Sequence, residues 1–135
     1  MKHRVDVLIS EADVKARVDA MAREIENSYQ PGDDILLVGL LRGSVVFLAD
    51  LARALNMSAE FDFMTVSSYG SSMHSSRDVK IIKDLDEDIQ GRHVLIVEDI
   101  IDSGLTLSWL LENFESRGAA SIEVFALLRK PDAAK

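Results

Sequence analysis

Residues Val94 to Thr106 read VLIVEDIIDSGLT and carry the most informative pattern in the chain. Its four leading apolar residues lack helical spacing, which is typical of a strand buried on both faces of a parallel sheet. Two adjacent carboxylates, Glu98 and Asp99, end that strand, and a turn of small residues then opens a helix near Leu105. Ligands of open parallel sheets bind beyond the carboxyl ends of the strands, so this junction is a candidate functional site.

The turn after this strand has the residue types of a phosphate cradle. Ser103, Gly104 and Thr106 combine hydroxyl donors with a glycine that lets the backbone approach a ligand, and a helix N-terminus adds free N–H groups. The two preceding carboxylates suit a ribose diol and, directly or through water, Mg²⁺. A simpler interpretation stays open, in which Asp102 or Ser103 only caps the helix and the carboxylates face solvent.

The other apolar patterns alternate between strands and helices. Helical spacing from Val14 to Ile25, preceded by Ser10 as an N-cap, predicts a first amphipathic helix. The run Ile35–Leu40 is typical of a second fully buried strand. The alternation implies an α/β fold, a parallel sheet flanked by helices on both faces. The expected elements are strands at 5–9, 35–40, 61–65, 79–82, 94–97 and 122–128, and helices at 14–25, 45–55 and 105–116.

The composition limits the possible classes of protein. The chain has 135 residues, of which 47% are hydrophobic and 28% charged, and this predicts one globular domain over residues 1–135. A net charge of −8 argues against nucleic-acid binding through a basic surface. The chain has no cysteine for disulfides or thiolate metal sites, and no apolar run reaches the ~20 residues of a membrane span. We therefore expect a cytoplasmic protein with neither a nucleic-acid nor a membrane partner.

The segment from Val94 to Thr106 resembles the phosphoribosyl diphosphate (PRPP) binding motif of the type I phosphoribosyltransferases. Flanking segments narrow the resemblance to the hypoxanthine-guanine phosphoribosyltransferases of purine salvage. Gly39–Ser44 is similar to the diphosphate loop of that family, and Asp62–Met64 is similar to one of its strands. Residues 67–80 look like its lid and lid exit, and Leu127–Lys130 looks like its base-recognising strand end. The resemblance covers essentially the whole chain in the same order.

This resemblance implies a Mg²⁺-dependent enzyme that transfers phosphoribose from PRPP to hypoxanthine or guanine and releases diphosphate. It implies a cis peptide between Leu41 and Arg42. It makes Lys130 the donor to the purine oxygen, because an ammonium has donors and no acceptor. By this resemblance the site residues are Asp102 as general base; Ser103, Gly104, Leu105 and Thr106 for the 5′-phosphate; Arg42 and Gly43 for diphosphate; Lys130 and Ile100 for the base; Ser68 and Tyr69 in the lid; and Glu98 and Asp99 for Mg²⁺ and the ribose hydroxyls.

Several of these residues have simpler interpretations when each segment is taken alone. Arg42 fits a surface arginine beside a glycine turn. The serine-rich residues 67–76 fit a plain exposed connector, and Lys130 fits a surface lysine near a chain end.

The chain departs from the family pattern after Lys130. Members of the family continue for some tens of residues beyond that lysine, and the extension supplies most of a hood over the purine. We therefore expect a C-terminally truncated core that keeps some phosphate affinity but turns over little unaided. The alternatives are a non-catalytic regulator that binds PRPP or nucleotide on the same fold, and a fragment kept as a structural piece. The family also implies a homodimer or homotetramer.

Overall fold

The computed structural model describes residues 10–67, 79–101 and 104–129, and within them all side chains except those of 99–101, 104–105 and 128–129. In chain order the elements are α1 (Glu11–Ser28), β1 (Ile35–Leu40), α2 (Val45–Ala54), β2 (Glu60–Ser67), β3 (Lys80–Lys83), β4 (His93–Ile101), α3 (Gly104–Ser116) and β5 (Ser121–Arg129). None of the helices in these ranges is long and apolar enough to cross a membrane.

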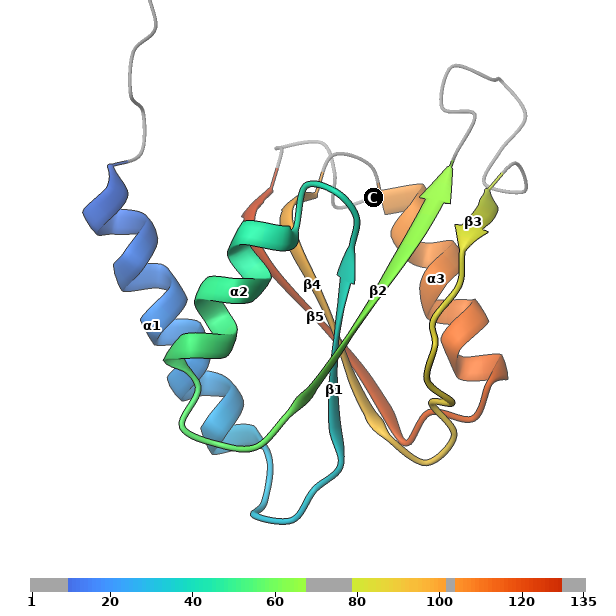
Figure 1. Cartoon of the computed structure of the whole chain (residues 1–135), viewed down its shortest axis with the longest axis horizontal. Helices are drawn as coiled ribbons and strands as arrows, with labels where there is room; N and C mark the ends of the chain where they lie inside the picture. The colour runs from blue at the N-terminus through green and yellow to red at the C-terminus, as the bar shows by residue number, and fades with distance from the viewer. Residues whose placement is uncertain (1–9, 68–78, 102–103, 130–135) are drawn as a thin grey trace, which may run out of the picture.

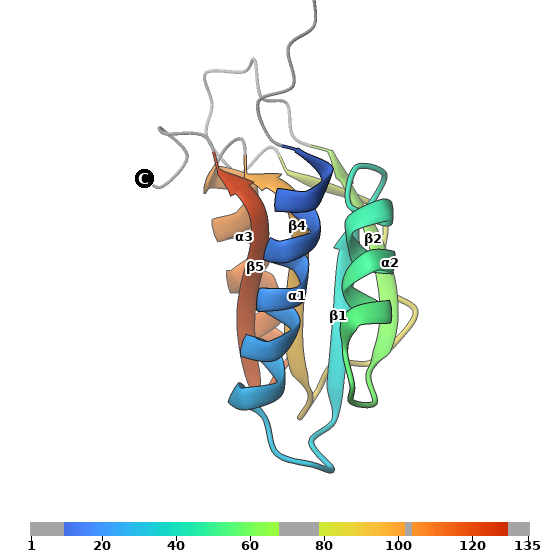
Figure 2. The ribbon, with the colours of Figure 1, turned by 90° about the vertical axis from the view of Figure 1, so that its left-hand side faces the viewer.

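The strands form one sheet in the order β3-β2-β1-β4-β5, in which β1, β2, β4 and β5 are mutually parallel (Figure 1). From β1 the chain passes through α2 to β2 on one side, and from β4 it passes through α3 to β5 on the other side. Because parallel crossovers are right-handed, these connections place α2 and α3 on opposite faces of the sheet (Figure 2). The direction of winding therefore reverses between β1 and β4. The predicted α/β class with helices on both faces is confirmed.

The core consists of two apolar layers, one on each face of the sheet. Leu37 and Leu95 pack with α1 and α2, whereas Leu36 and Val94 pack with α3. All six residues of β1 are buried, as its uninterrupted apolar run predicted. Burial on both faces explains why this strand lacks the alternation of an exposed one.

The N-cap expected for the first helix is confirmed, since the Ser10 hydroxyl accepts the N–H of Asp13 at 3.1 Å. Other features differ from the expectation. The edge strand β3 runs antiparallel to β2, because a chain that returns directly pairs antiparallel, whereas a parallel return must first cross the sheet. β4 continues to Ile101 instead of ending at Val97, because its pairing with β5 continues as far as Arg129. The strand expected at residues 5–9 lies outside the described residues.

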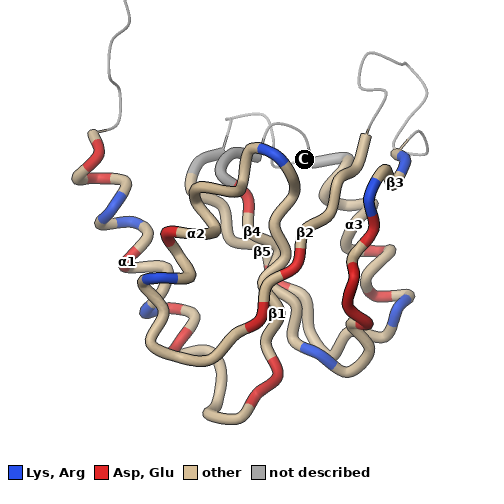
Figure 3. Tube along the Cα trace, viewed as in Figure 1, with Lys and Arg blue, Asp and Glu red and all other residues tan. Residues whose placement is uncertain are grey.

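A buried guanidinium joins three carboxylates at the edge where the parallel strands begin. Arg92 is 7% exposed, and its Nε donates to Oδ1 of Asp34 at 2.9 Å. The same guanidinium pairs with Glu60 and lies 3.5 Å from Glu87. Asp34 immediately precedes β1, Glu60 begins β2 and Arg92 immediately precedes β4, so this cluster ties three strand ends together. This edge is the lower one in Figure 3, where acidic and basic segments lie along it.

We expect Arg92→Ala to lower the free energy of unfolding by about 2–3 kcal/mol, because it removes a buried cation that is shared by three carboxylates, whose own side chains are 46–66% exposed. Urea denaturation followed by circular dichroism measures the change. Arg53→Ala is the control, since the Arg53 side chain is 73% exposed and pairs within its own helix with Asp50; its loss should stay below about 0.5 kcal/mol. Equal losses in both variants would contradict the role assigned to the cluster.

Tyr29 follows α1 and is buried against the start of β4. Its hydroxyl donates to the carboxylate of Glu123, and its ring lies edge-on to His93 with the ring centroids 5.3 Å apart. Burial, together with the adjacent Glu123 carboxylate, raises the pKa of the Tyr29 hydroxyl above its ordinary value. The neutral phenol is therefore the form that the folded protein favours.

The raised pKa of Tyr29 makes stability depend on pH in the alkaline range. Below pH ~10 the phenol is neutral in both the folded and the unfolded state, so its contribution is fully present. Above that pH the unfolded chain releases the proton first, and the free energy of unfolding falls. We expect this fall to be steeper in the wild type than in Tyr29→Phe when urea denaturation is repeated from pH 8 to 11. Parallel pH profiles would contradict the expectation.

Candidate functional site

The carboxyl ends of the four parallel strands lie along one edge of the sheet, the upper edge in Figure 1. At this edge β1 is shorter than both of its neighbours. Its last residue, Leu40, is in register with Met64, whereas β2 runs on to Ser67 and β4 to Ile101. The turn after β1 therefore lies between the ends of two longer strands, where the winding of the sheet reverses. Open α/β sheets bind their ligands at such a point.

The turn between β1 and α2 contains both residues expected to bind diphosphate. The peptide bond between Leu41 and Arg42 is cis, as the family resemblance implied. Arg42 and Gly43 are exposed, whereas Ser44 is fully buried. The N–H of Leu41 donates to the carbonyl oxygen of Met64 at 2.9 Å, which fastens the start of the turn to β2. The turn is thus anchored to the sheet and exposes one cation and one glycine.

The junction of β4 and α3 forms the other described part of this edge. Glu98 is half-buried within β4, in register with Ala126 of β5. The first residue of α3 is Gly104, close in the chain to the end of β4, so the helix begins near the carboxyl edge. Thr106 lies in its first turn and is half-buried. A helix N-terminus placed in this way offers free backbone N–H groups to an anion.

Other expected site residues are described only in part or not at all. Asp99 and Ile100 lie within β4, and Gly104 and Leu105 lie in the first turn of α3, each with a described backbone. The remaining expected residues, which lie outside the described ranges, are Ser68, Tyr69, Asp102, Ser103 and Lys130. In sequence, these five follow β2, β4 and β5, whose carboxyl ends share this edge.

Ser44 ends the segment that resembles the diphosphate loop, but its residue type alone predicted no separate role for it. A serine just before a helix is ordinarily interpreted as an N-cap, but the Ser44 side chain makes no capping hydrogen bond. Its hydroxyl donates instead to the carbonyl oxygen of Leu40 at 2.7 Å. The sequence could not predict this bond. A serine also directly precedes α1, and there the same residue type, Ser10, does cap the helix.

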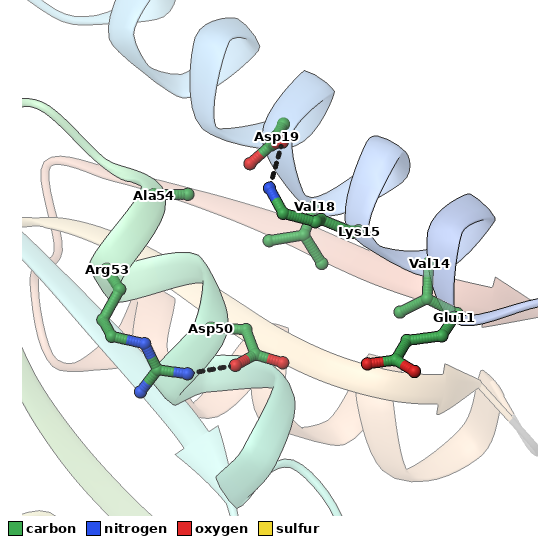
Figure 4. Close-up of a pocket in the computed structure, with 8 residues that line it drawn as sticks. All are labelled: Glu11, Val14, Lys15, Val18, Asp19, Asp50, Arg53 and Ala54. Atoms are coloured by element: carbon green, nitrogen blue, oxygen red, sulfur yellow. Dashed lines mark hydrogen bonds and ion pairs between the residues drawn. The ribbon is translucent and has the colours of Figure 1, made fainter.

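A separate groove of about 460 Å³ lies between α1 and α2 (Figure 4). Both cations that line it are paired with neighbouring acidic residues: Lys15 Nζ lies 3.2 Å from Oδ2 of Asp19, and Arg53 contacts Asp50. These cations are therefore already neutralised and give an anionic ligand little charge to bind. The residues that line the groove are Glu11, Val14, Lys15, Val18, Asp19, Asp50, Arg53 and Ala54.

Comparisons of sequence and of structure with known proteins point to the same family. The family model of the phosphoribosyl transferase domain matches residues 9–135. The chain is 57% identical over 132 residues to the hypoxanthine phosphoribosyltransferase of Escherichia coli, an alignment that covers 97% of this chain and 74% of that protein. It is 54% identical over 132 residues to the hypoxanthine-guanine phosphoribosyltransferase of Mycobacterium avium, covering 94% of this chain and 65% of that protein.

A crystal structure of a hypoxanthine-guanine phosphoribosyltransferase from Bacillus anthracis superposes with a TM-score of 0.90 at 39% identity. This superposition covers 98% of the present chain and 78% of that structure. The likeness therefore extends over the whole described sheet and its helices, including the turn after β1 and the junction of β4 and α3.

Proposed function

The chain belongs to the phosphoribosyltransferase family, and we propose that it transfers the 5-phosphoribosyl group of PRPP to N9 of hypoxanthine or guanine. The bond from the anomeric carbon to diphosphate breaks, the bond to N9 forms, and the N9 proton passes to a base. The products are IMP or GMP and diphosphate, a step of purine salvage. The observation that carries the proposal is the exposed turn with Arg42 and Gly43 at the reversal point of the sheet.

Diphosphate binding falls to the turn after β1 in this proposal. The Arg42 guanidinium is exposed to solvent and presents several N–H donors to phosphate oxygens. Gly43 adds no side chain beside it, so a phosphate can approach the backbone. Because negative charge accumulates on diphosphate as it leaves, a fixed cation at this position stabilises the transition state more than the bound substrate.

The 5′-phosphate binds in this proposal to residues 103–106. The N-terminal backbone of α3 supplies N–H groups there, and Gly104 gives a phosphate room to approach them. Thr106 adds a hydroxyl donor in the same turn. Phosphate and diphosphate would then be held on the two sides of the point where β1 and β4 part, which aligns the sugar between them.

Magnesium fits the donor chemistry of this edge. Among the described side chains, no group of three or more His, Asp or Glu is arranged to hold a metal ion. Mg²⁺ in proteins is ordinarily bound by one or two carboxylates together with substrate phosphates, so it needs no such cage. Glu98 and Asp99 are the carboxylates that would hold it, together with the ribose hydroxyls. When bound, Mg²⁺ neutralises charge on the departing diphosphate.

The purine is recognised and deprotonated by residues that follow β4 and β5 in the chain. Asp102 accepts the N9 proton as general base. Lys130 donates to the 6-oxo group, which a 6-amino purine cannot match, because an ammonium is a donor only. Ile100 lines the base pocket, and Ser68 and Tyr69 belong to a lid that excludes water during the reaction.

We further propose that residues 1–135 act as one domain in a cytoplasmic homo-oligomer, a dimer or a tetramer. Apolar side chains on α2, β2 and β3 support association, since Val46, Phe61 and Ile82 are 70%, 52% and 60% exposed. Apolar residues left on a surface are candidates for burial between subunits.

The enzyme hypothesis is tested by incubating the protein with PRPP, Mg²⁺ and each of hypoxanthine, guanine and adenine. We expect nucleotide to form slowly from the two 6-oxo purines and not from adenine. We expect Asp102→Ala to lower kcat by about 10²- to 10⁴-fold, while the affinity for Mg²⁺ and PRPP, measured by calorimetry, stays within about twofold. Arg53→Ala, far from the proposed site, is the control. Binding of PRPP by the wild type without turnover would instead favour a ligand-binding regulator.

A further inference from the structure

We infer that Ser44 is a positioning residue for the diphosphate turn. Its buried hydroxyl holds the carbonyl group of Leu40, the last residue of β1, and so sets the shape of the turn that exposes Arg42 and Gly43. The inference rests on the proposed function, because it explains how the diphosphate site is held rather than what it binds.

The two serines that precede helices in this chain behave differently. Ser10 has an extended backbone, with φ −75° and ψ 159°, and its side chain accepts the N–H of Asp13. This is the conformation of a capping residue. Ser44 has φ −81° and ψ −5°, and its side chain makes no capping bond to α2. The hydroxyl of Ser44 is therefore directed back to the strand, so its contribution is to the turn and not to the helix.

Two hydrogen bonds from Ser44 converge on one carbonyl oxygen. Its Oγ–H donates to the oxygen of Leu40 at 2.7 Å, and its N–H lies 3.4 Å from the same atom. The shorter bond comes from the side chain, so the hydroxyl makes the closer of the two contacts that close the turn. Removing it leaves the Leu40 oxygen with only the longer bond from Ser44.

Ser44 differs in solvent exposure from the residues that it would position. Ser44 is 0% exposed, whereas Arg42 and Gly43 are exposed. A buried hydroxyl cannot touch a ligand in solvent, so any effect of Ser44 on diphosphate must pass through the backbone of the turn. The start of the turn is also held by a second bond, from the Leu41 N–H to the carbonyl oxygen of Met64 in β2.

The strand beneath the turn leaves room for this hydroxyl. A Cβ built at Gly39 would lie 2.9 Å from Ser44 Oγ, closer than such atoms pack, and 3.0 Å from Cδ2 of Leu48, at the tight limit of real contacts. Gly39 is thus the position in β1 where the absence of a side chain admits the Ser44 side chain. A glycine within a fully buried strand is unfavourable by itself. The space that the Ser44 side chain needs is a structural reason for a glycine at position 39.

The test compares Ser44→Ala with Ser28→Ala in the full chain. Ser28 donates the same kind of bond, from its hydroxyl to the carbonyl oxygen of Glu24 four residues earlier at 2.8 Å, but at the C-terminus of α1. Calorimetry with Mg²⁺ and inorganic diphosphate measures affinity, steady-state kinetics give KM for PRPP and for hypoxanthine, and thermal denaturation gives the folded fraction. A second variant, Ser44→Cys, keeps a weaker S–H donor.

We expect Ser44→Ala to weaken diphosphate binding and to raise KM for PRPP by about 3- to 10-fold, the order of effect expected when one buried hydrogen bond is lost. KM for hypoxanthine should stay within about twofold, Ser44→Cys should lose less than Ser44→Ala, and Ser28→Ala should match the wild type. Unchanged diphosphate affinity in Ser44→Ala overturns the inference, as do losses for both substrates that follow the folded fraction. A wild type that binds neither diphosphate nor PRPP overturns the proposed function itself.

Discussion

β1 pairs in parallel with β2 on one side and with β4 on the other, and this pairing organises both apolar cores and the carboxyl edge of the sheet. The side chains of β1 point alternately into the two apolar cores, and all six residues of this strand are buried. Because β1 stops at Leu40 while its neighbours continue, the following turn is held between two longer strands. Because α2 and α3 leave toward opposite faces, the winding of the sheet reverses between β1 and β4, the kind of point at which open α/β sheets bind ligands.

The two edges of the sheet carry charge in different ways. At the amino edge, the buried Arg92 forms ion pairs with three carboxylates, those of Asp34, Glu60 and Glu87. Its positive charge is therefore compensated within the protein and helps to hold the strand ends together. At the carboxyl edge, Arg42 is exposed on a turn. A cation of this kind is solvated and available, which suits binding of an anionic ligand. The arginine that joins strand ends and the arginine proposed to bind diphosphate thus lie at opposite ends of the same sheet.

Much of the fold follows from local patterns in the sequence. The apolar runs of β1 and β4 and the serine before α1 predicted elements that the structure confirms, and the motif at residues 94–106 pointed to the family that the comparisons support. The end predicted for β4 came too early in the chain, because Glu98 and Asp99 are polar and polar residues ordinarily end a buried strand. Pairing with β5 extends it to Ile101, and such pairing is not visible in a local pattern.

Residue types and their spacing along the chain were enough to predict the α/β class and the order of the elements. The residues proposed to bind phosphate, metal and base came from the resemblance of short motifs to one family. Three features became visible only in the folded chain: β3 is antiparallel, Arg92 is buried while Arg42 is exposed, and Ser44 bonds to Leu40 instead of capping α2. The physical reason is that hydrogen-bond partners and burial are set by segments distant in the chain, or by the backbone angles of one turn, and residue type specifies neither.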